Sequence, residues 1–175
     1  MSTMPAYYTE QLNWVANKAL DFSSTPDREQ WHVLIFSHVS LVLDDVYGSD
    51  IGITNGEVMW DLIRAFRDGV PYTSASTSGN EDSAYDIAAD FTEQGPMKEI
   101  ASMFGHVHYD QSIERDGMNM ISTNNAYTHK EFEISPERIE GTASETVFDI
   151  ITVDLASSEM VLVRVGAGED RIIHF

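Results

Sequence analysis

The sequence of 175 residues contains no cysteine. This absence excludes disulfide frameworks, thiolate nucleophiles and zinc sites built from thiolates. A metal ion in this chain would have to be held by histidine, aspartate, glutamate, asparagine or water, which are ligands of hard or borderline ions. Metal chemistry would therefore depend on the 6 histidines and on the carboxylates.

Basic residues are scarce. There are 10 lysines and arginines against 29 aspartates and glutamates, which gives a formal net charge of -19. Such a surface repels phosphate backbones and anionic lipids, so we expect no nucleic-acid surface and no membrane binding. An acidic surface attracts cations, as expected for a metalloprotein. The same surface is also explained by solubility alone. An anionic substrate would need local positive charge to offset the field.

Long apolar runs are also missing. No stretch reaches the roughly 20 residues that a membrane span needs. The first residues have neither a basic region nor an apolar core, so we expect no signal peptide and a cytoplasmic protein. The hydrophobic content of 42% and the aromatic content of 10% indicate a folded globule, which we expect to be a single domain over residues 1–175.

The periodicity of apolar residues predicts a mixed α/β fold. Thr9 is the expected N-cap of the first helix, and all three tryptophans are expected in the core. The polar segment 72–82 predicts a surface loop, and 123–141 predicts an irregular region. The expected helices are 7–21 and 55–68. The expected strands are 31–36 (buried), 99–104, 118–122, 146–155, 160–165 and 171–175, and 85–91 is expected as a strand with a helix as the alternative.

The stretch from Phe104 to Asp110 contains two histidines, His106 and His108, just after a glycine and an apolar run. On an extended backbone, residues two apart lie on the same face, so both imidazoles could reach one metal or two adjacent metals. Gly105 would let the backbone approach a ligand closely. The alternative is that two surface histidines stand two apart by chance.

A second apolar strand, 31–36, runs directly into His38. We therefore expect His38, His106 and His108 at the carboxyl ends of strands, the edge where α/β sheets bind ligands. His32, early in the strand, is expected to be structural or exposed. Three histidines cannot hold two divalent ions without carboxylates, and no spacing argument selects a nearby aspartate for that role.

These residues carry a family resemblance. Phe36-Ser37-His38, followed far downstream by Gly105-His106-Val107-His108, resembles the last two metal motifs of the calcineurin-like metallophosphoesterases, as found in bacteria and phages. The likeness continues through residues 121–126 and 165–171. It implies a four-layer αββα sandwich, hydrolysis of a phosphomonoester or phosphodiester, and two divalent ions of the Mn, Fe, Zn or Ni class. In that family, His38 and His106 would bind one ion and His108 the other.

The chain also departs from the family pattern. The amino-terminal motifs D-x-H, G-D-x-x-D and G-N-H-[DE] should come before the first helix, and they are missing here. The chain therefore resembles the carboxyl-terminal half of such an enzyme, with one mixed β-sheet and its covering helices. We expect a partial or empty metal site, little activity in isolation, and either a missing amino-terminal half or self-association through an exposed sheet face.

Three further residues are weaker candidates. Asp110 could orient a histidine as a carboxylate acceptor. Tyr109 and His129 are candidates for lining a substrate cleft, with plain surface residues as the alternative, and Arg171 is expected to be ion-paired. Two other functions stay open: a non-catalytic interaction or assembly module, and an acidic cation-binding protein without phosphate chemistry.

Overall fold

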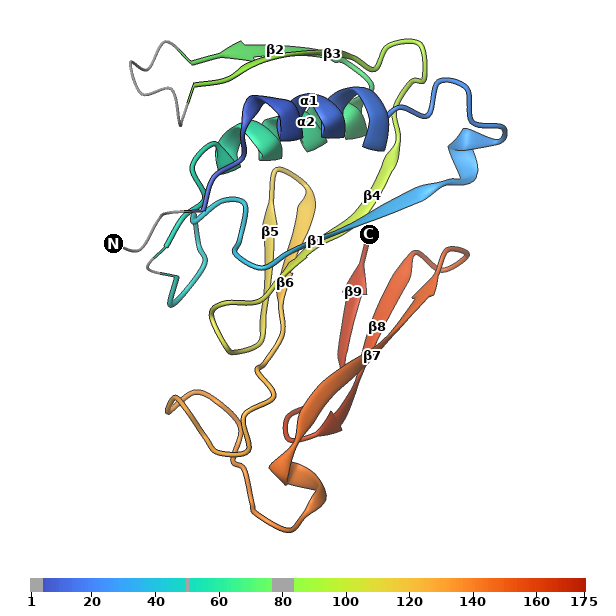
Figure 1. The fold of residues 1–175 in the computed structure, drawn as a ribbon. Coiled ribbons are helices and arrows are strands. Elements are labelled where there is room, and N and C mark those ends of the chain that lie inside the picture. Colours follow the sequence, from blue (N-terminus) through green and yellow to red (C-terminus); the bar gives the residue numbers. More distant parts are fainter. Residues whose placement is uncertain (1–4, 50, 77–83) are drawn as a thin grey trace. The chain divides into compact units, whose positions relative to one another are not determined.

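The computed structural model describes residues 5–49, 51–76 and 84–175 and has a mixed α/β fold with few helices, as predicted at the level of fold class. Its chain forms two compact units (Figure 1). The first unit comprises Met1–Val33, Ser40–Asp44 and Ser49–Glu99, and the second comprises Leu34–Val39, Asp45–Gly48 and Ile100–Phe175.

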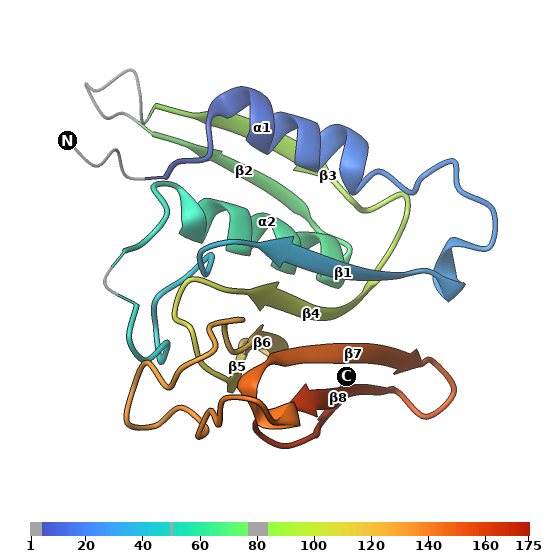
Figure 2. The ribbon, with the colours of Figure 1, turned by 60° about the horizontal axis from the view of Figure 1, so that its bottom comes forward.

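The first unit is built from two helical segments and a two-stranded antiparallel sheet. Both helices cover the same face of the sheet (Figures 1 and 2). Within the described ranges, no helix is both long and apolar enough to span a membrane. The elements are α1 (Thr9–Trp14) with a π-helical turn (Val15–Ala19), a short 3-10 helix (Arg28–Gln30), α2 (Gly56–Asp68), β2 (Pro71–Ala75) and β3 (Asp86–Asp90).

Helix α2 confirms the prediction for 55–68. Its apolar residues recur at helical spacing and are buried, with Leu62 and Phe66 fully enclosed. Asn55 is its N-cap, and the helix ends at Gly69, which adopts a left-handed φ of 65°. A Cβ atom at Gly69 would lie only 2.4 Å from the backbone nitrogen of Pro96, so glycine is required there for space as well as for conformation.

Helix α1 protects the open edge of β3. The side chains of Thr9, Asn13 and Asn17 donate hydrogen bonds to the carbonyls of residues 84, 86 and 88, at 3.2, 2.8 and 3.3 Å. Four residues of a helix and two residues of a strand both advance by about 6 to 7 Å. The donor side chains, four residues apart, therefore have the same spacing as the acceptor carbonyls, two residues apart. An edge strand covered in this way cannot pair with another chain.

Three predictions for this unit are wrong in detail. The N-cap of α1 is Tyr8 rather than Thr9, which lies inside the helix and bonds to the edge of β3 instead. Trp14 is 61% exposed rather than core, whereas Trp60 is buried as predicted. The predicted loop 72–82 begins with strand β2, and its part from 77 to 83 lies outside the described residues.

The second unit contains two β-sheets. The first is mixed, with strand order β1-β4-β6-β5, and the second is antiparallel, with order β7-β8-β9. The strands are β1 (His32–Ser37), β4 (Lys98–Phe104), β5 (Gln111–Arg115), β6 (Met118–Ser122), β7 (Val147–Asp154), β8 (Glu159–Gly166) and β9 (Arg171–His174). Strands β2 and β5 were not predicted.

The carboxyl ends of β1, β4 and β6 meet at one edge of the mixed sheet. Strands β1 and β4 run in the same direction (Figure 2), and β4 pairs in parallel with β6, with Phe104 opposite Ser122. The side chains that follow these three strands are therefore neighbours, as expected for ligand sites in α/β sheets.

The two sheets of the second unit share one hydrophobic core. Apolar residues of β4 and β6 pack with residues of β8 and β9 in a single buried cluster, which consists of Ile100, Ala101, Met103, Ile121, Met160, Leu162 and Ile173. Strand β1 exists as predicted but is not buried as predicted, because Phe36 is 66% exposed. Trp31, just before it, is exposed as well and is not a core residue.

The opposite face of the β7-β8-β9 sheet is apolar and exposed. Phe148 and Ile150 on β7 lie on the same face as Val163, which is directly opposite Ile150, and as Ile172 of β9. All four side chains are exposed, Phe148 by 53% and Ile172 by 58%. Contiguous apolar surface of this kind is typical of an interaction face.

Glu99 on β4 should make stability depend on pH. Burial raises the pKa of its carboxyl group to about 7, against the opposing effect of Arg67, and its Oε1 has no hydrogen-bond partner among the described residues. Between pH 4.5 and 7 the folded protein keeps a proton on Glu99 that the unfolded chain releases. The contribution of Glu99 to stability is therefore most favourable at low pH and is lost as the pH rises through 7.

We expect Glu99→Gln to remove this dependence. Near pH 4.5 the variant and the wild type should have the same free energy of unfolding. At pH 8 the free energy of unfolding of the variant should be higher by on the order of 1–3 kcal/mol. Urea denaturation of both proteins across this pH range measures the difference. A difference that stays constant with pH would show that Glu99 has an ordinary pKa in the folded state.

Candidate functional site

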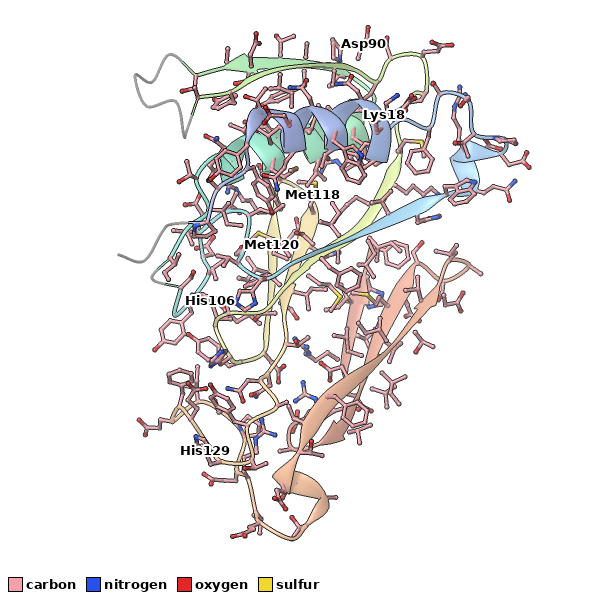
Figure 3. The ribbon with its side chains drawn as sticks, viewed as in Figure 1. Lys18, Asp90, His106, Met118, Met120 and His129 are labelled. Atoms are coloured by element: carbon pink, nitrogen blue, oxygen red, sulfur yellow. The ribbon has the colours of Figure 1, made fainter. Side chains whose placement is uncertain are left out.

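His38 and His106 lie side by side at the edge formed by the strand ends. His38 directly follows β1, and His106 follows β4 after one glycine. Their ring centroids are 5.5 Å apart in an edge-to-face arrangement. The backbone N–H of Gly105 donates to the carbonyl of His38 at 3.0 Å, which holds the two segments together. Figure 3 shows His106 just beyond the end of β4.

The backbone at His106 and His108 is not extended as predicted. Both residues have left-handed φ angles, 66° and 64°, and the N–H of Val107 bonds to the carbonyl of Gly105 at 2.7 Å in a tight turn. The left-handed region is uncommon for residues other than glycine, and strain of this kind clusters at functional sites. Val107 and Tyr109 are buried between and after the histidines and anchor the turn.

The neighbouring protein atoms do not require glycine at position 105. A Cβ atom at this position would lie 3.6 Å from the carbonyl oxygen of His38 and 3.8 Å from its Nδ1, which are ordinary van der Waals distances. Glycine is therefore not needed to avoid a clash. Its effect is to leave the space beside the His38 ring open.

His108 is held by a carboxylate that sequence reasoning missed. Its Nδ1 lies 2.8 Å from Oε2 of Glu131, which also accepts a short hydrogen bond from the side chain of Asn125. A hydrogen bond donated from Nδ1 to this carboxylate oxygen leaves Nε2 as the ring's ligating nitrogen. Glu131 lies 23 residues after His108 in an irregular segment, so no spacing signal could have identified it.

Asp110 does not orient a histidine as expected. Its Oδ1 accepts hydrogen bonds from the backbone N–H of Asn124 at 2.9 Å and from Nη2 of Arg164 at 2.8 Å, and it lies 3.3 Å from Nη2 of Arg171. Arg171 is ion-paired as predicted, because it also contacts Asp149 at 3.2 Å. Asp110 is thus part of a network of two aspartates and two arginines.

Arg164 is the centre of this network. Its side chain is only 2% exposed, and it contacts the buried Asp149 at 2.6 Å as well as Asp110. Burial on its own lowers the pKa of Arg164, but the hydrogen bonds to Asp149 and Asp110 outweigh burial and raise it above its ordinary value. Arg164 therefore stays charged.

The two weaker candidates occupy different environments. Tyr109 is buried and packs against the rings of Tyr47 and Phe132 at centroid distances of 5.6 and 5.5 Å. Burial, with a smaller effect of Tyr47, raises the pKa of Tyr109, and its ring serves the packing of the turn. His129 is exposed in the irregular segment (Figure 3). Its ring stacks on that of Tyr127, with the ring centroids 5.3 Å apart.

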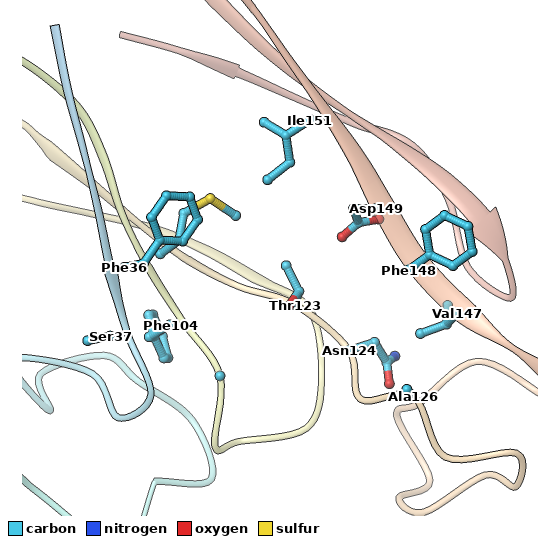
Figure 4. Close-up of a pocket in the computed structure, with 12 residues that line it drawn as sticks. Phe36, Ser37, Phe104, Thr123, Asn124, Ala126, Val147, Phe148, Asp149 and Ile151 are labelled. Atoms are coloured by element: carbon cyan, nitrogen blue, oxygen red, sulfur yellow. The ribbon is translucent and has the colours of Figure 1, made fainter.

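A cavity of about 420 Å³ opens beside the strand ends. Ser37, Gly105 and Thr123 line it where β1, β4 and β6 end, and Asn124 and Asp149 line it further along. In Figure 4, Thr123 and Asn124 lie on the segment that follows β6, and Asp149 lies on β7. The volume is within the range of small-molecule sites.

The donor set suits a metal ion only in part. His38 and His106 place two imidazoles together, and imidazole suits ions of the Zn, Fe, Ni and Co class. Among residues 5–49, 51–76 and 84–175, no group of three or more histidine, aspartate or glutamate side chains is arranged to hold one ion. A complete site would need ligands beyond these two rings.

No protein-family model, curated protein or solved structure matches this chain. The resemblance to the calcineurin-like metallophosphoesterases therefore stays a prediction from the sequence motifs.

The left-handed backbone at His106 can be tested by substitution. We expect His106→Gly to be more stable than His106→Ala by about 1 kcal/mol, because a Cβ atom is unfavourable at positive φ and glycine has none. Denaturation of the two variants by urea measures the difference. Equal stabilities, or a more stable alanine variant, would contradict the conformation described for this turn.

Proposed function

We propose that the chain is part of a metal-dependent phosphoesterase, with His38, His106 and His108 as its contribution to a two-ion site. The observation that carries this proposal is the placement of His38 and His106 with ring centroids 5.5 Å apart, at the carboxyl ends of two strands of one sheet. The order of the motifs, S-H followed by G-H-x-H, supports the same assignment.

Each residue would have a separate role in the proposed site. His38 and His106 would hold one ion and His108 the other, with Glu131 fixing the orientation of the His108 ring through Nδ1. Divalent ions of the Mn, Fe, Zn or Ni class, when bound, would act as Lewis acids on the phosphoryl oxygens and lower the pKa of water. The cavity beside Ser37 and Gly105 would receive the substrate.

The remaining ligands would come from a segment with D-x-H, G-D-x-x-D and G-N-H-[DE] motifs, supplied by the same gene product or by a separate chain. The apolar outer face of the β7-β8-β9 sheet is a suitable surface for that segment, since Phe148 and Ile172 are more than half exposed there. With it, the two packed sheets of the second unit would become the centre of an αββα sandwich. Alone, the chain would be inactive or nearly so.

Metal binding by this chain should depend on the paired histidines. We expect weak binding of Mn²⁺ or Zn²⁺, and a loss of affinity of at least about tenfold in His38→Ala and in His106→Ala, because each substitution removes one ring of the pair. Isothermal titration calorimetry with each metal measures the affinities. His174→Ala is the matched control, because His174 lies on β9 with an exposed side chain.

Two results would contradict this assignment. If His38→Ala and His106→Ala bind metal as tightly as the wild type, the ions are attracted by the acidic surface alone. If His174→Ala loses as much affinity as they do, the effect is not specific to the pair.

Phosphoesterase activity should require the complementing motifs. We expect hydrolysis of bis(p-nitrophenyl) phosphate with Mn²⁺ when a segment with the three amino-terminal motifs is present, and little from this chain alone. In the complemented protein, His108→Ala should lower kcat by at least about tenfold, since it removes a ligand of one ion. A complemented protein that folds and binds metal but does not hydrolyse phosphoesters would exclude the proposed phosphoesterase activity.

The apolar sheet face also favours a second candidate function, a non-catalytic assembly module. The four exposed apolar residues of β7, β8 and β9 would serve either function. The coding sequence upstream of Met1, or a neighbouring reading frame, distinguishes them: the three motifs there favour the enzyme, and their absence favours the module.

A further inference from the structure

Helix α2 begins at an asparagine followed by a glycine, and the fold requires both residues. Asn55 has a left-handed φ of 65°, a conformation that asparagine tolerates better than most other residues. Its Nδ2 donates to the carbonyl of Tyr7 at 2.8 Å. A Cβ atom at Gly56 would lie 2.0 Å from the backbone oxygen of Leu41, so a larger residue does not fit there. Conformation and space therefore fix the pair.

The same pair is chemically labile. In an asparagine–glycine sequence, the backbone nitrogen of the glycine can attack Cγ of the asparagine, because glycine has no side chain to hinder the approach. The new N–C bond closes a five-membered succinimide ring, and the side-chain amide leaves as ammonia. Water then opens the ring at either carbonyl, which gives aspartate or isoaspartate. Asn55-Gly56 is the one asparagine–glycine pair in the sequence.

The folded structure opposes this reaction at each of its groups. The attacking atom, the backbone nitrogen of Gly56, donates its N–H to the carbonyl of Ile53 at 2.9 Å, and Gly56 is buried. The ψ of Asn55 is 18°, whereas closure of the ring needs an extended ψ. The amide that must leave is held by the carbonyl of Tyr7. The reaction therefore needs these contacts to open first.

The amino-terminal segment 5–7 fixes the carbonyl that holds this amide. The N–H of Tyr7 donates to the carbonyl of Thr54 at 3.0 Å, and the N–H of Thr54 donates to the carbonyl of Pro5 at 2.8 Å. Ala6 and Thr54 form a parallel β-bridge. The segment and the start of α2 belong to the same compact unit, the first, so opening of that unit exposes Asn55.

We propose that Asn55 is a site of spontaneous deamidation that the fold protects, and that the chain is modified there when the first unit opens. The products do not restore the start of α2. Aspartate has no N–H to donate to the carbonyl of Tyr7. Isoaspartate adds a methylene group to the backbone, just where the N–H of Met59 bonds to the carbonyl of Asn55 at 3.2 Å. This inference is independent of the proposed phosphoesterase.

The first test compares rates of deamidation in the folded chain, in the chain unfolded in guanidinium chloride, and in a synthetic peptide of residues 51–61. Peptide mapping by mass spectrometry detects the gain in mass at Asn55. Asp68 and Asp116 also precede glycine, but they isomerise without a change of mass. We expect the folded chain to react at least about a hundredfold more slowly than the peptide, because native proteins are unfolded only in a fraction of about 10⁻³ or less.

Two variants test whether protection depends on opening of the first unit. Leu62 is fully enclosed on α2, so Leu62→Ala should destabilise this unit and raise the rate at Asn55 by at least about tenfold. Ile172→Ala is the matched control, because the side chain of Ile172 is 58% exposed on β9 in the second unit. Its removal should leave the rate unchanged.

The second test measures refolding. The wild type and Asn55→Gly are held unfolded for increasing times and then diluted, and circular dichroism measures the native fraction recovered. Glycine adopts the left-handed φ and has no amide to lose. We expect the native fraction of the wild type to fall in step with deamidation, and that of Asn55→Gly to stay constant. Peptide mapping of the refolded and unrefolded wild type, separated by size, gives the same answer without a variant.

Each outcome decides the inference. It is supported by slow reaction in the folded chain, by acceleration in Leu62→Ala but not in Ile172→Ala, and by deamidated Asn55 in the unrefolded fraction alone. It is overturned if the folded chain reacts as fast as the peptide, or if Leu62→Ala leaves the rate unchanged. It is overturned as well if deamidated molecules refold as completely as unmodified ones.

Discussion

The burial of Arg164 is the constraint on which the site region depends. A guanidinium that is 2% exposed must have anionic partners, and it finds them in Asp149 of β7 and in Asp110, which follows the histidine turn. Asp110 in turn accepts the backbone N–H of Asn124. One buried cation thereby ties the β7-β8-β9 sheet to the segments that follow β4 and β6, and it fixes one wall of the cavity.

This network also changes the electrostatics that the composition suggests. A net charge of -19 should repel an anionic substrate, yet three of the 10 basic residues, Arg138, Arg164 and Arg171, gather near the same strand ends. Two of them are neutralised by aspartates, and Arg138 is not. Positive charge is therefore concentrated near these strand ends, in a chain that is otherwise strongly acidic.

The secondary structure was largely predictable from local patterns, and its failures have a common cause. Helix α2 and strands β7 and β8 were predicted because their apolar spacing is regular over 8 to 13 residues. Strands β2 and β5 were missed because their side chains are polar, and backbone pairing alone makes them strands. Trp14 and Phe36 were assigned to the core by side-chain type, but burial depends on what packs against a residue, which a local window does not contain.

Sequence alone determined that His38 and His106 each follow an apolar strand, because the strand period and its end are local properties. Tertiary structure decided the rest: the left-handed turn that carries His106 and His108, the pairing of His108 with Glu131, and the unpaired donors of Arg138 and Asn124. The contacts of His108 with Glu131 and of Arg138 with Asn124 join residues that are 23 and 14 positions apart through an irregular segment. An irregular segment has no repeating period, so the separation of two residues in its sequence does not predict whether they are in contact. Only the tertiary structure brings these groups together.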